Sequence, residues 1–428
     1  MQKVNAHVRR LLLGLGACIL LCVLLATFLL NSDEARAFLS PSLIDSFSSQ
    51  GSSVKTPTTV LKKFMSEQLP VPDDFYIERV DSSKSLLAAL ANANKRGGST
   101  AIYLHDGEYH INQTLRVLSD NIMLLSVSQN PYTTIIRSRG MRRTSGVQNV
   151  LEVRASGFVL DGITLSDAPN HLIQIAAENQ ASKPIIRNCI LQDSFEQLLK
   201  VSYDQASRPN NISHDGLVEH CIFQYTRGIA PYYYTGGIDA LGAKGWRVQN
   251  NIFKDIASPG GRIAQHAVHF WINASDNKVT NNIFIDNDRS IGFGMKLKNR
   301  DTDTLEYFSE GGVISGNVIY HTNNGDPFAD TGIILEASPN TRVENNYVFM
   351  QHSYRNAIEY RFKETRNAVI KDNFTNRAIR SRNGGNARLI DNSDDLDSLV
   401  FFDQLERIIR DHHIEHLAHP MKGSDKHD

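Results

Sequence analysis

Cysteine is scarce in this chain of 428 residues, which contains only four. Cys18 and Cys22 lie inside a hydrophobic N-terminal run, and Cys189 and Cys221 stand apart, without a CxxC pair or a Cys/His cluster. Metal sites built on cysteine need such spacing, so the pattern excludes them. Net charge is also small, because 45 basic residues face 46 acidic ones. Nucleic-acid binding favours a strongly basic face, so we expect no nucleic-acid partner.

Charge is absent altogether from residues 11–30, a run long enough to cross about 30 Å of hydrocarbon as a helix. Lys3, Arg9 and Arg10 precede it, and basic flanks stay in the cytoplasm. We expect a cytoplasmic tail at 1–10 and a transmembrane signal-anchor at 11–30. The protein would be membrane-anchored through this helix, with its bulk extracytoplasmic, which means periplasmic in a Gram-negative bacterium.

Two other interpretations of this segment stay open. Ala35-Arg36-Ala37 resembles a signal-peptidase site, although the apolar run is long for a cleaved signal. Leu15-Gly16-Ala17-Cys18 resembles a lipoprotein box, although most of the apolar run follows it. All three interpretations place the folded part outside the cytoplasm. Residues 31–74, whose first part is rich in Ser, Thr and Pro, are expected to form a linker or stalk.

A repeat begins near residue 147. Each copy is six residues long, as in VQNNIF, which begins at Val248. The first residue is aliphatic, the fourth is a small residue or Asn, and apolar residues follow it. Copies start 27 to 35 residues apart, at Val159, Ile186, Val218, Val248, Val279, Ile314, Val343 and Ile370. A second alternating run precedes most copies, for example GIDAL and AVHFW. A period near thirty with alternating apolar residues predicts one turn of a β-solenoid, because helical repeats would show a 3.6-residue period.

The fourth position of the motif is mostly Asn, from Asn251 to Asn373. Asn tolerates a left-handed backbone at tight turns, and stacked Asn side chains can hydrogen-bond from coil to coil. Cys189 and Cys221 occupy this position in consecutive coils. Either a disulfide or a packed pair of thiols fits that placement.

This repeat resembles the pectate-lyase-like superfamily of right-handed parallel β-helices, which includes polysaccharide lyases and epimerases. The entry segment 85–111 also resembles the capping helix, Gly turn and first strand of that superfamily. The resemblance implies an all-β fold, a right-handed parallel β-helix over residues 75–393. Residues 394–428 are expected to form an amphipathic helix and tail, the helix capping the open end of the solenoid.

Stacking of the second run predicts a column of outward residues, with neighbours about 4.8 Å apart. Three adjacent coils then present Lys200, Asp239 and His269 side by side. The carboxylate would orient the histidine and raise its basicity. We therefore predict a catalytic site of Lys200, Asp239, His269 and the nearby His266.

Long loops that contain aromatic and basic residues enter this part of the column. They favour substrate binding, since rings stack on sugar faces and cations neutralise carboxylates. The predicted substrate-binding residues are Arg227, Tyr232, Tyr233, Tyr234, Lys244, Arg262, Trp271, Arg289 and Lys296.

This chemistry suits removal of the C5 proton from a uronate, with a Tyr or His that protonates the leaving oxygen. We expect a membrane-tethered lyase or epimerase that acts as a monomer on an acidic polysaccharide. A hydrolase needs two carboxylates within about 5–10 Å, but the next carboxylate in the column, Glu359, lies four coils or about 19 Å from Asp239. Hydrolysis is therefore disfavoured unless a loop acid such as Asp255 turns inward. The alternative is a glycan-binding or surface-structural β-helix without catalysis.

We expect no cofactor and no metal site. Asp286-Asn287-Asp288 and Asp301-Thr302-Asp303 carry the oxygen ligands that calcium prefers, but neither matches an EF-hand and polar turns are the simpler interpretation. The histidines between His412 and His419 include an i, i+4 pair, for which a solvated helix end is the simpler interpretation.

Overall fold

The computed structural model describes residues 67–142, 148–296 and 308–411. Residues 67–405 lie in one compact unit. The predicted membrane segment 11–30 and the linker up to residue 66 lie outside the described residues. None of the described helices is both long and hydrophobic enough to cross a bilayer.

Within these described ranges the strands form four sheets, and neighbouring strands run parallel. Sheet A contains, in hydrogen-bonding order, β1 Tyr76–Val80, β2 Thr100–Leu104, β5 Ile122–Ser126, β8 Val159–Asp161, β11 Ile185–Arg187, β15 Leu217–Glu219, β19 Arg247–Gln249, β23 Lys278–Thr280, β27 Val313–Ser315, β30 Arg342–Glu344, β33 Ala368–Lys371 and β36 Ala387–Ile390. Sheet B contains β3 Gly107–His110, β6 Thr134–Arg137, β9 Thr164–Ala168, β12 Ile190–Ser194, β16 Ile222–Gln224, β20 Ile252–Lys254, β24 Ile283–Ile285, β28 Val318–His321, β31 Tyr347–Met350 and β34 Phe374–Thr375.

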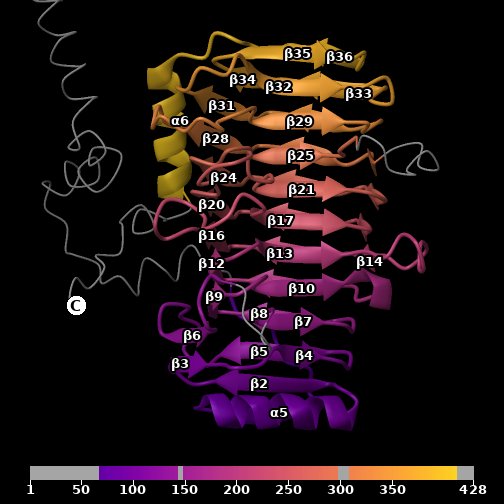
Figure 1. Ribbon diagram of the computed structural model, residues 1–428, viewed down its shortest axis with the longest axis vertical. Helices are drawn as coiled ribbons and strands as arrows, with labels where there is room; N and C mark the ends of the chain where they lie inside the picture. Colours follow the sequence, from indigo (N-terminus) through magenta and orange to yellow (C-terminus); the bar gives the residue numbers. More distant parts are fainter. Residues whose placement is uncertain (1–66, 143–147, 297–307, 412–428) are drawn as a thin grey trace, which may run out of the picture. The chain divides into compact units, whose positions relative to one another are not determined.

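Sheet C faces the viewer in Figure 1. Its strands are β4 Leu115–Val117, β7 Leu151–Val153, β10 Ile173–Ala176, β13 Gln197–Ser202, β17 Gly236–Leu241, β21 Val268–Trp271, β25 Ile291–Phe293, β29 Ile333–Glu336, β32 Asn356–Arg361 and β35 Ala378–Arg382. The small sheet D contains β14 Ser213–His214, β18 Ala243–Lys244, β22 Ala274–Ser275 and β26 Ser309–Glu310. A short 3₁₀ helix, η1 Ala177–Asn179, follows β10.

Each coil passes through sheets A, B and C in turn, as β8, β9 and β10 do before β11 returns to sheet A. The predicted parallel β-helix is therefore confirmed. Its right-handed sense stays a prediction, supported by the hand that parallel crossovers adopt. The variable loops that the sequence predicts connect sheet B to sheet C.

The register of sheet A confirms the repeat from Ile186 onward, because Ile186 pairs with Val218 and Val218 pairs with Val248. The first copy is displaced by one residue. Ile186 pairs with Leu160 rather than with Val159. Gly162 therefore falls at the left-handed corner of its coil, with φ +75°, and does not share the position of Cys189.

The predicted asparagine ladder is present and runs from Asn251 to Asn392. From Asn282 onward each side-chain oxygen accepts hydrogen bonds from the backbone and side-chain N–H groups of the Asn in the preceding coil, as Asn317 does from Asn282 at 3.0 Å. Asn251, the first member, accepts from the backbone N–H of Cys221. The left-handed residue lies one position earlier than expected, for example at Asn250 and Asn281 with φ +56°. Turn formation and coil-to-coil bonding thus belong to two adjacent positions.

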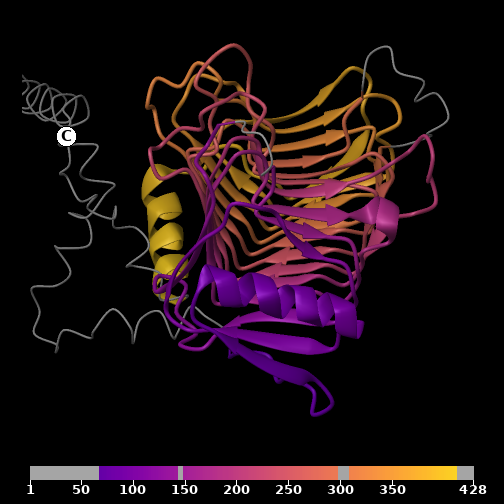
Figure 2. The same ribbon diagram turned by 60° about the horizontal axis from the view of Figure 1, so that its bottom comes forward.

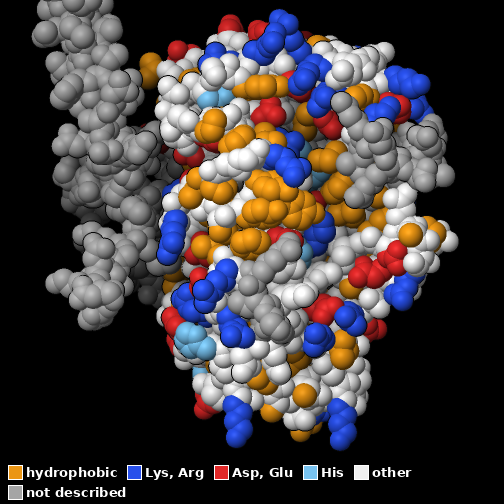
Figure 3. Space-filling view, in the orientation of Figure 1, with side chains coloured by type: hydrophobic (Ala, Val, Ile, Leu, Met, Phe, Trp, Pro, Cys, Tyr) orange, Lys and Arg blue, Asp and Glu red, His pale blue; other side chains and the backbone are white. Residues whose placement is uncertain are grey.

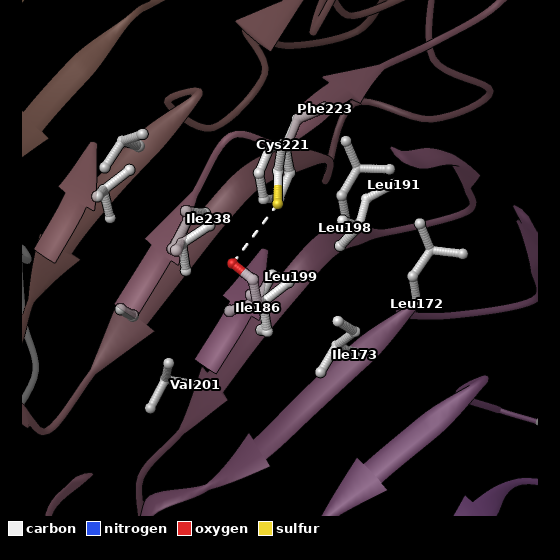
Figure 4. Packing of buried hydrophobic residues seen from close by; sticks show 14 of the residues in the cluster. Leu172, Ile173, Ile186, Leu191, Leu198, Leu199, Val201, Cys221, Phe223 and Ile238 are labelled. Atoms are coloured by element: carbon white, nitrogen blue, oxygen red, sulfur yellow. Dashed lines mark hydrogen bonds between the residues drawn. The ribbon is translucent and has the colours of Figure 1, made fainter. Parts of the chain in front are cut away.

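Inward side chains form one continuous hydrophobic cluster along the stack. Phe223, Phe253 and Phe284 stack on one another with ring centroids 4.7 and 4.9 Å apart. Figure 4 shows part of this interior, where the Cys221 thiol donates to the carbonyl of Ile186 at 3.5 Å. Cys189 and Cys221 are free thiols.

Helix α5, Ser83–Arg96, lies across the first coil (Figures 1 and 2). Ser82 and Ser85 form a capping box at its start, and Gly97 ends it with φ +94°. Leu86, Leu90 and other buried residues of α5 join the core. The resemblance of segment 85–111 to a capping helix, a Gly turn and a strand is confirmed.

Helix α6, Ser398–Asp411, does not cap the end of the solenoid as expected. Phe401 stacks on Phe349 of β31 with centroids 5.1 Å apart, and Phe402 meets Tyr320 of β28 at 5.4 Å. Both partners point outward from sheet B, so α6 packs beside the stack (Figure 1). The apolar stripe was predicted correctly, but stripes of this kind fit any hydrophobic surface. Residues 412–428, with the predicted histidine pair, lie outside the described residues.

The asparagine ladder yields a stability prediction. Asn317 is fully buried, and it also donates to Val279 and Asn346 at 2.9 Å. Asn317→Ala leaves several buried polar groups without partners, each of which costs about 1–3 kcal/mol. We expect the free energy of unfolding to fall by about 3 kcal/mol in urea denaturation. Asn386→Ala, at an exposed position, should change it by less than about 0.5 kcal/mol, and equal effects would contradict a stabilising ladder.

Candidate functional site

The predicted row on sheet C is formed. Lys200 of β13 pairs in register with Asp239 of β17, and Asp239 pairs with His269 of β21. Side chains alternate along a strand, so these three residues share the outer face of the sheet. The register that the sequence predicts is therefore confirmed for all three coils.

The row is more enclosed than a solvated strand face. Asp239 is 1% exposed and His269 is 0% exposed, whereas the Lys200 side chain keeps 14% of its surface accessible. The first two residues therefore point outward from the sheet, as predicted, but are not exposed to solvent. Their cover comes from neighbouring side chains, chiefly Trp271 and His266, which lie against the His269 ring.

Asp239 is the centre of the site. One carboxylate oxygen accepts the Lys200 ammonium in a short ion pair, and the other accepts the Trp271 indole N–H at 2.6 Å. His269 Nδ1 lies 3.7 Å from that second oxygen. Burial by itself raises the pKa of Asp239, but Lys200 and His269 outweigh it, so its pKa lies below the ordinary value. Asp239 therefore stays ionised.

Lys200 stays charged for the complementary reason. Burial opposes its charge, but the negative charge of Asp239 and the proximity of Tyr234 outweigh burial, so the pKa of Lys200 is raised. The site thus holds a fixed cation with part of its surface accessible. Such a cation can neutralise a carboxylate brought by a ligand.

His269 lies between two rings. Trp271 stacks on it almost parallel, with centroids 5.2 Å apart and 3° between the planes, and His266 lies 4.5 Å away. Its Nε2 lies 3.0 Å from the carbonyl oxygen of Gly294, so that nitrogen carries the proton. Burial lowers the pKa of His269 to about 4, against the opposing effect of Asp239.

His266 occupies the space above Gly292, where an added Cβ would lie 2.7 Å from the imidazole. Gly292 follows His269 in the row, and any larger residue there would displace the ring. Neither nitrogen of His266 has a hydrogen-bond partner among the described residues. Burial, Arg289 and His269 hold its pKa well below the ordinary value, so His266 is a neutral base with unused hydrogen-bonding capacity.

The loop before β17 carries three consecutive tyrosines, of which Tyr234 lies near Lys200. Tyr232 stacks on Phe195 at 5.1 Å, and Tyr233 receives the Arg262 guanidinium on its face at 4.4 Å. Burial raises the pKa of Tyr234, with Lys200 opposing the effect of the nearby acids, so its phenol stays protonated. Figure 3 shows hydrophobic side chains gathered over the middle of sheet C, with Lys and Arg beside them.

The structure separates three of the predicted substrate-binding residues from this cluster, whereas a fourth, Arg289, lies close to His266 and His269 but has another partner. Lys244 lies on β18 of sheet D, with Asp276 at 3.9 Å. Lys296 pairs with Glu364 at 2.8 Å, and Arg227 is exposed in its loop. Arg289 directs its guanidinium at the carbonyl of Ala264 rather than outward, at 2.7 and 3.1 Å. Proximity in sequence to the strands of sheet C did not predict where these cations point. The position of each side chain is set by its own place in the coil and by its nearest partner.

Two buried residues extend the site and were not predicted. His171 lies just before β10 and Glu196 just before β13, with Nε2 and Oε2 3.9 Å apart. Burial and Lys200 lower the pKa of His171 to about 3. Both residues lie just before a strand of sheet C, in consecutive coils. This shared position in the repeat is the feature of the sequence from which their proximity could have been predicted. Glu196 also supplies a second carboxylate near Lys200, which the argument from the column did not include.

The predicted polar triplet Asp286-Asn287-Asp288 directs its oxygens at backbone N–H groups. Asp286 accepts from Thr322 at 2.7 Å, Asn287 from Ile256 at 3.0 Å and Asp288 from Ala264 at 2.7 Å. Among the described residues no group of His, Cys, Asp or Glu has the arrangement of a metal site. The triplet at 301–303 lies outside the described residues.

Comparisons with known proteins support the fold. No family model matches the chain, and no curated protein matches it. A solved structure described as a glycoside hydrolase is 8% identical, with a TM-score of 0.52 over 76% of this chain and 98% of that one. An alginate lyase from Paenibacillus sp. str. FPU-7 is 14% identical, with a TM-score of 0.44 over 66% of this chain and 99% of that one. At 8% identity the likeness to the glycoside hydrolase shows a common fold and nothing further.

The enclosed histidines predict a specific dependence of stability on pH. Unfolded histidines bind protons near pH 6.5, whereas folded His269 does so only near pH 4 and folded His171 near pH 3. Between these values the unfolded state binds more protons, so stability is complete above about pH 6.5 and falls as the pH falls. Down to about pH 4.5 each ring contributes at most ~3 kcal/mol of this loss.

Urea denaturation at several pH values between about 7 and 4.5 measures this slope. His269→Gln should flatten it, whatever the variant does to absolute stability at neutral pH. Asn386→Ala, at an exposed position, removes no titratable group and should leave the slope unchanged. An unaltered slope in the His269 variant would show that this ring is not held neutral.

Proposed function

We propose that this protein is a carbohydrate-active enzyme that removes the C5 proton of a uronate in an acidic polysaccharide. One observation carries the proposal. Buried Asp239 fixes a partly accessible ammonium, Lys200, near the protonated phenol of Tyr234, and the same row leads through His269 to the neutral imidazole of His266, whose nitrogens have no hydrogen-bond partner among the described residues. A cation, an acid and a base are the groups that this reaction needs.

Lys200 would bind the uronate carboxylate. Removal of the C5 proton places negative charge on C5 and the adjoining carboxylate, and a fixed cation stabilises that charge in a site with little water. Asp239 keeps Lys200 in place through the ion pair and orients Trp271 through the indole hydrogen bond. Because Asp239 is 1% exposed, it acts through these neighbours and does not touch the sugar.

His266 would accept the C5 proton on one of its free nitrogens. In elimination the C4–O4 bond then breaks, a C4–C5 double bond forms, and Tyr234 donates its proton to O4. In epimerisation the C4–O4 bond stays and a proton returns to C5 from the opposite face. His269, fully enclosed against His266, would hold that ring in place.

The exposed part of the site supports a sugar ligand. Tyr233 with Arg262 on its face, and Tyr232 stacked on Phe195, present flat surfaces in the loop that also carries Tyr234. Sugar rings have apolar faces that pack against aromatic side chains, and Arg can in addition pair with a uronate carboxylate. Trp271, partly exposed above His269, would extend this surface.

We further propose that residues 11–30 tether the enzyme to a membrane as a monomer, with the β-helix on the extracytoplasmic side. The support is the uncharged run and its basic flank of Lys3, Arg9 and Arg10. An extracytoplasmic location would give the site access to surface or periplasmic polysaccharide.

A glycan-binding protein without catalysis is the second candidate. The enclosure of His266 and His269, at 2% and 0% exposure, favours it, because a buried base cannot reach a sugar without movement of its cover. Binding needs only the accessible Lys200, Arg262 and tyrosine surface. The two functions differ in their products, so one assay separates them.

The purified full-length chain, incubated with polyuronates, should produce either unsaturated uronate ends, detected by ultraviolet absorbance, or exchange of C5 hydrogen for deuterium in heavy water. His266→Gln and Tyr234→Phe should each lower kcat by about 10²–10⁴, the usual contribution of acid–base catalysis. Lys200→Met should abolish turnover, because both charge stabilisation and binding are lost.

Lys244→Met is the matched control, since Lys244 also lies near an aspartate but on sheet D. It should retain full turnover. A polymer that binds the wild-type chain and shows neither unsaturated ends nor C5 exchange would identify a binding protein. New reducing ends without unsaturation would indicate hydrolysis, for which Glu196 would be the first residue to replace.

A further inference from the structure

The loop between β20 and β21, residues 255–267, carries two groups of the proposed site. Arg262 reaches the Tyr233 hydroxyl at 2.9 Å, and His266 lies over Gly292. Both groups depend on the path of the loop, which contains no helix or strand of its own. What fixes that path therefore fixes the site.

Three consecutive residues of the next coil hold this loop. Asn287 accepts from the N–H of Ile256 at 3.0 Å and donates to the carbonyl of Phe253 at 3.0 Å, which secures the start of the loop. The backbone N–H of Asp288 donates to Ile256 at 3.1 Å. These bonds hold only the start of the loop. The middle of the loop is held by the Asp288 carboxylate.

The Asp288 carboxylate bonds to both sides of the loop. It accepts from Ser258 at 3.2 Å and from Ala264 at 2.7 Å, two N–H groups six positions apart. Arg289 binds the carbonyl of the same Ala264 at 2.7 and 3.1 Å. Asp288 is 0% exposed and Ser258 is 4% exposed, so water cannot replace these partners without opening the loop.

We propose that Asp288, between Asn287 and Arg289, is a positioning residue that closes residues 258–264 into a fixed loop and thereby sets Arg262 and His266 in the site. The proposal rests on the proposed function for its effect on turnover, but not for its effect on the loop. The sequence favours a polar turn for Asp286-Asn287-Asp288 and substrate binding for Arg289. The contacts of residues 287–289 instead assign this segment to holding the loop.

The first test measures the loop without substrate. In Asp288→Ala, hydrogen exchange at the amides of Ser258 and Ala264 should accelerate by roughly tenfold or more, because both donors lose their acceptor. Asp286→Ala is the matched control from the same segment, since Asp286 accepts from Thr322 instead. That control should accelerate exchange at Thr322 and leave Ser258 and Ala264 unchanged. Unchanged exchange at those two amides in Asp288→Ala would overturn the proposal.

The second test separates positioning from general support of the fold. Asp288→Asn keeps a side-chain oxygen for both amides and should restore wild-type exchange and turnover. Asp288→Ala should lower kcat/KM by roughly tenfold or more in the wild-type chain. In the His266→Gln background it should add little further loss, because the base that Asp288 positions is already gone. Asp286→Ala should leave kcat/KM unchanged. Multiplicative losses from Asp288→Ala and His266→Gln would overturn the positioning role.

The two proposals fail in different ways. If the wild-type chain turns over no polyuronate, the proposed function fails, while accelerated exchange in Asp288→Ala still supports the held loop. If turnover is present and a loosened loop leaves kcat/KM intact, the positioning role fails alone. Should Asp288→Ala not fold, Asp288→Ser provides the same exchange test, because its hydroxyl is too short to reach both amides.

Discussion

The parallel hydrogen-bonding of each strand to the strand one coil later is the constraint on which the rest of this structure depends. It fixes which side chains are neighbours, because a residue on one coil meets its register partner about 4.8 Å away. A shift by one residue would turn every outward side chain inward. The asparagine ladder adds a second bond from coil to coil at the corner, so the register is held outside the strands as well.

The same constraint explains how a lysine and an aspartate are tolerated in a nearly enclosed place. Removing both charges from water is costly, and their attraction offsets that cost only when the remaining hydrogen-bonding capacity is also used. Asp239 meets this condition, with Lys200 on one oxygen and the Trp271 indole on the other. The histidines avoid the cost in another way, because His269 and His266 remain neutral.

The sequence predicts the features that repeat from coil to coil, but it does not predict the packing of side chains that lie outside the repeat. The pairing of Asp239 with His269 followed from the period, and so did the solenoid. The burial of both residues did not follow, because their cover comes from side chains such as His266 whose direction no repeat specifies. The displaced first copy at Leu160 and the lateral docking of α6 have the same origin. Each depends on a local fit between surfaces, and neither a spacing nor a stripe contains that information.

The variable loops are the part of the fold that the sequence predicts least well. From sequence, an Asp-Asn-Asp triplet offers oxygens to a cation, to a turn or to backbone N–H groups, and the three uses have the same composition. In the folded chain a long loop of the preceding coil brings backbone N–H groups next to Asn287 and Asp288, and these two side chains are their acceptors. Buried donors without acceptors are costly, so the loop and the carboxylate satisfy each other. A solenoid can thus vary its loops and still place a side chain such as His266 reproducibly, provided that the next coil supplies the acceptors.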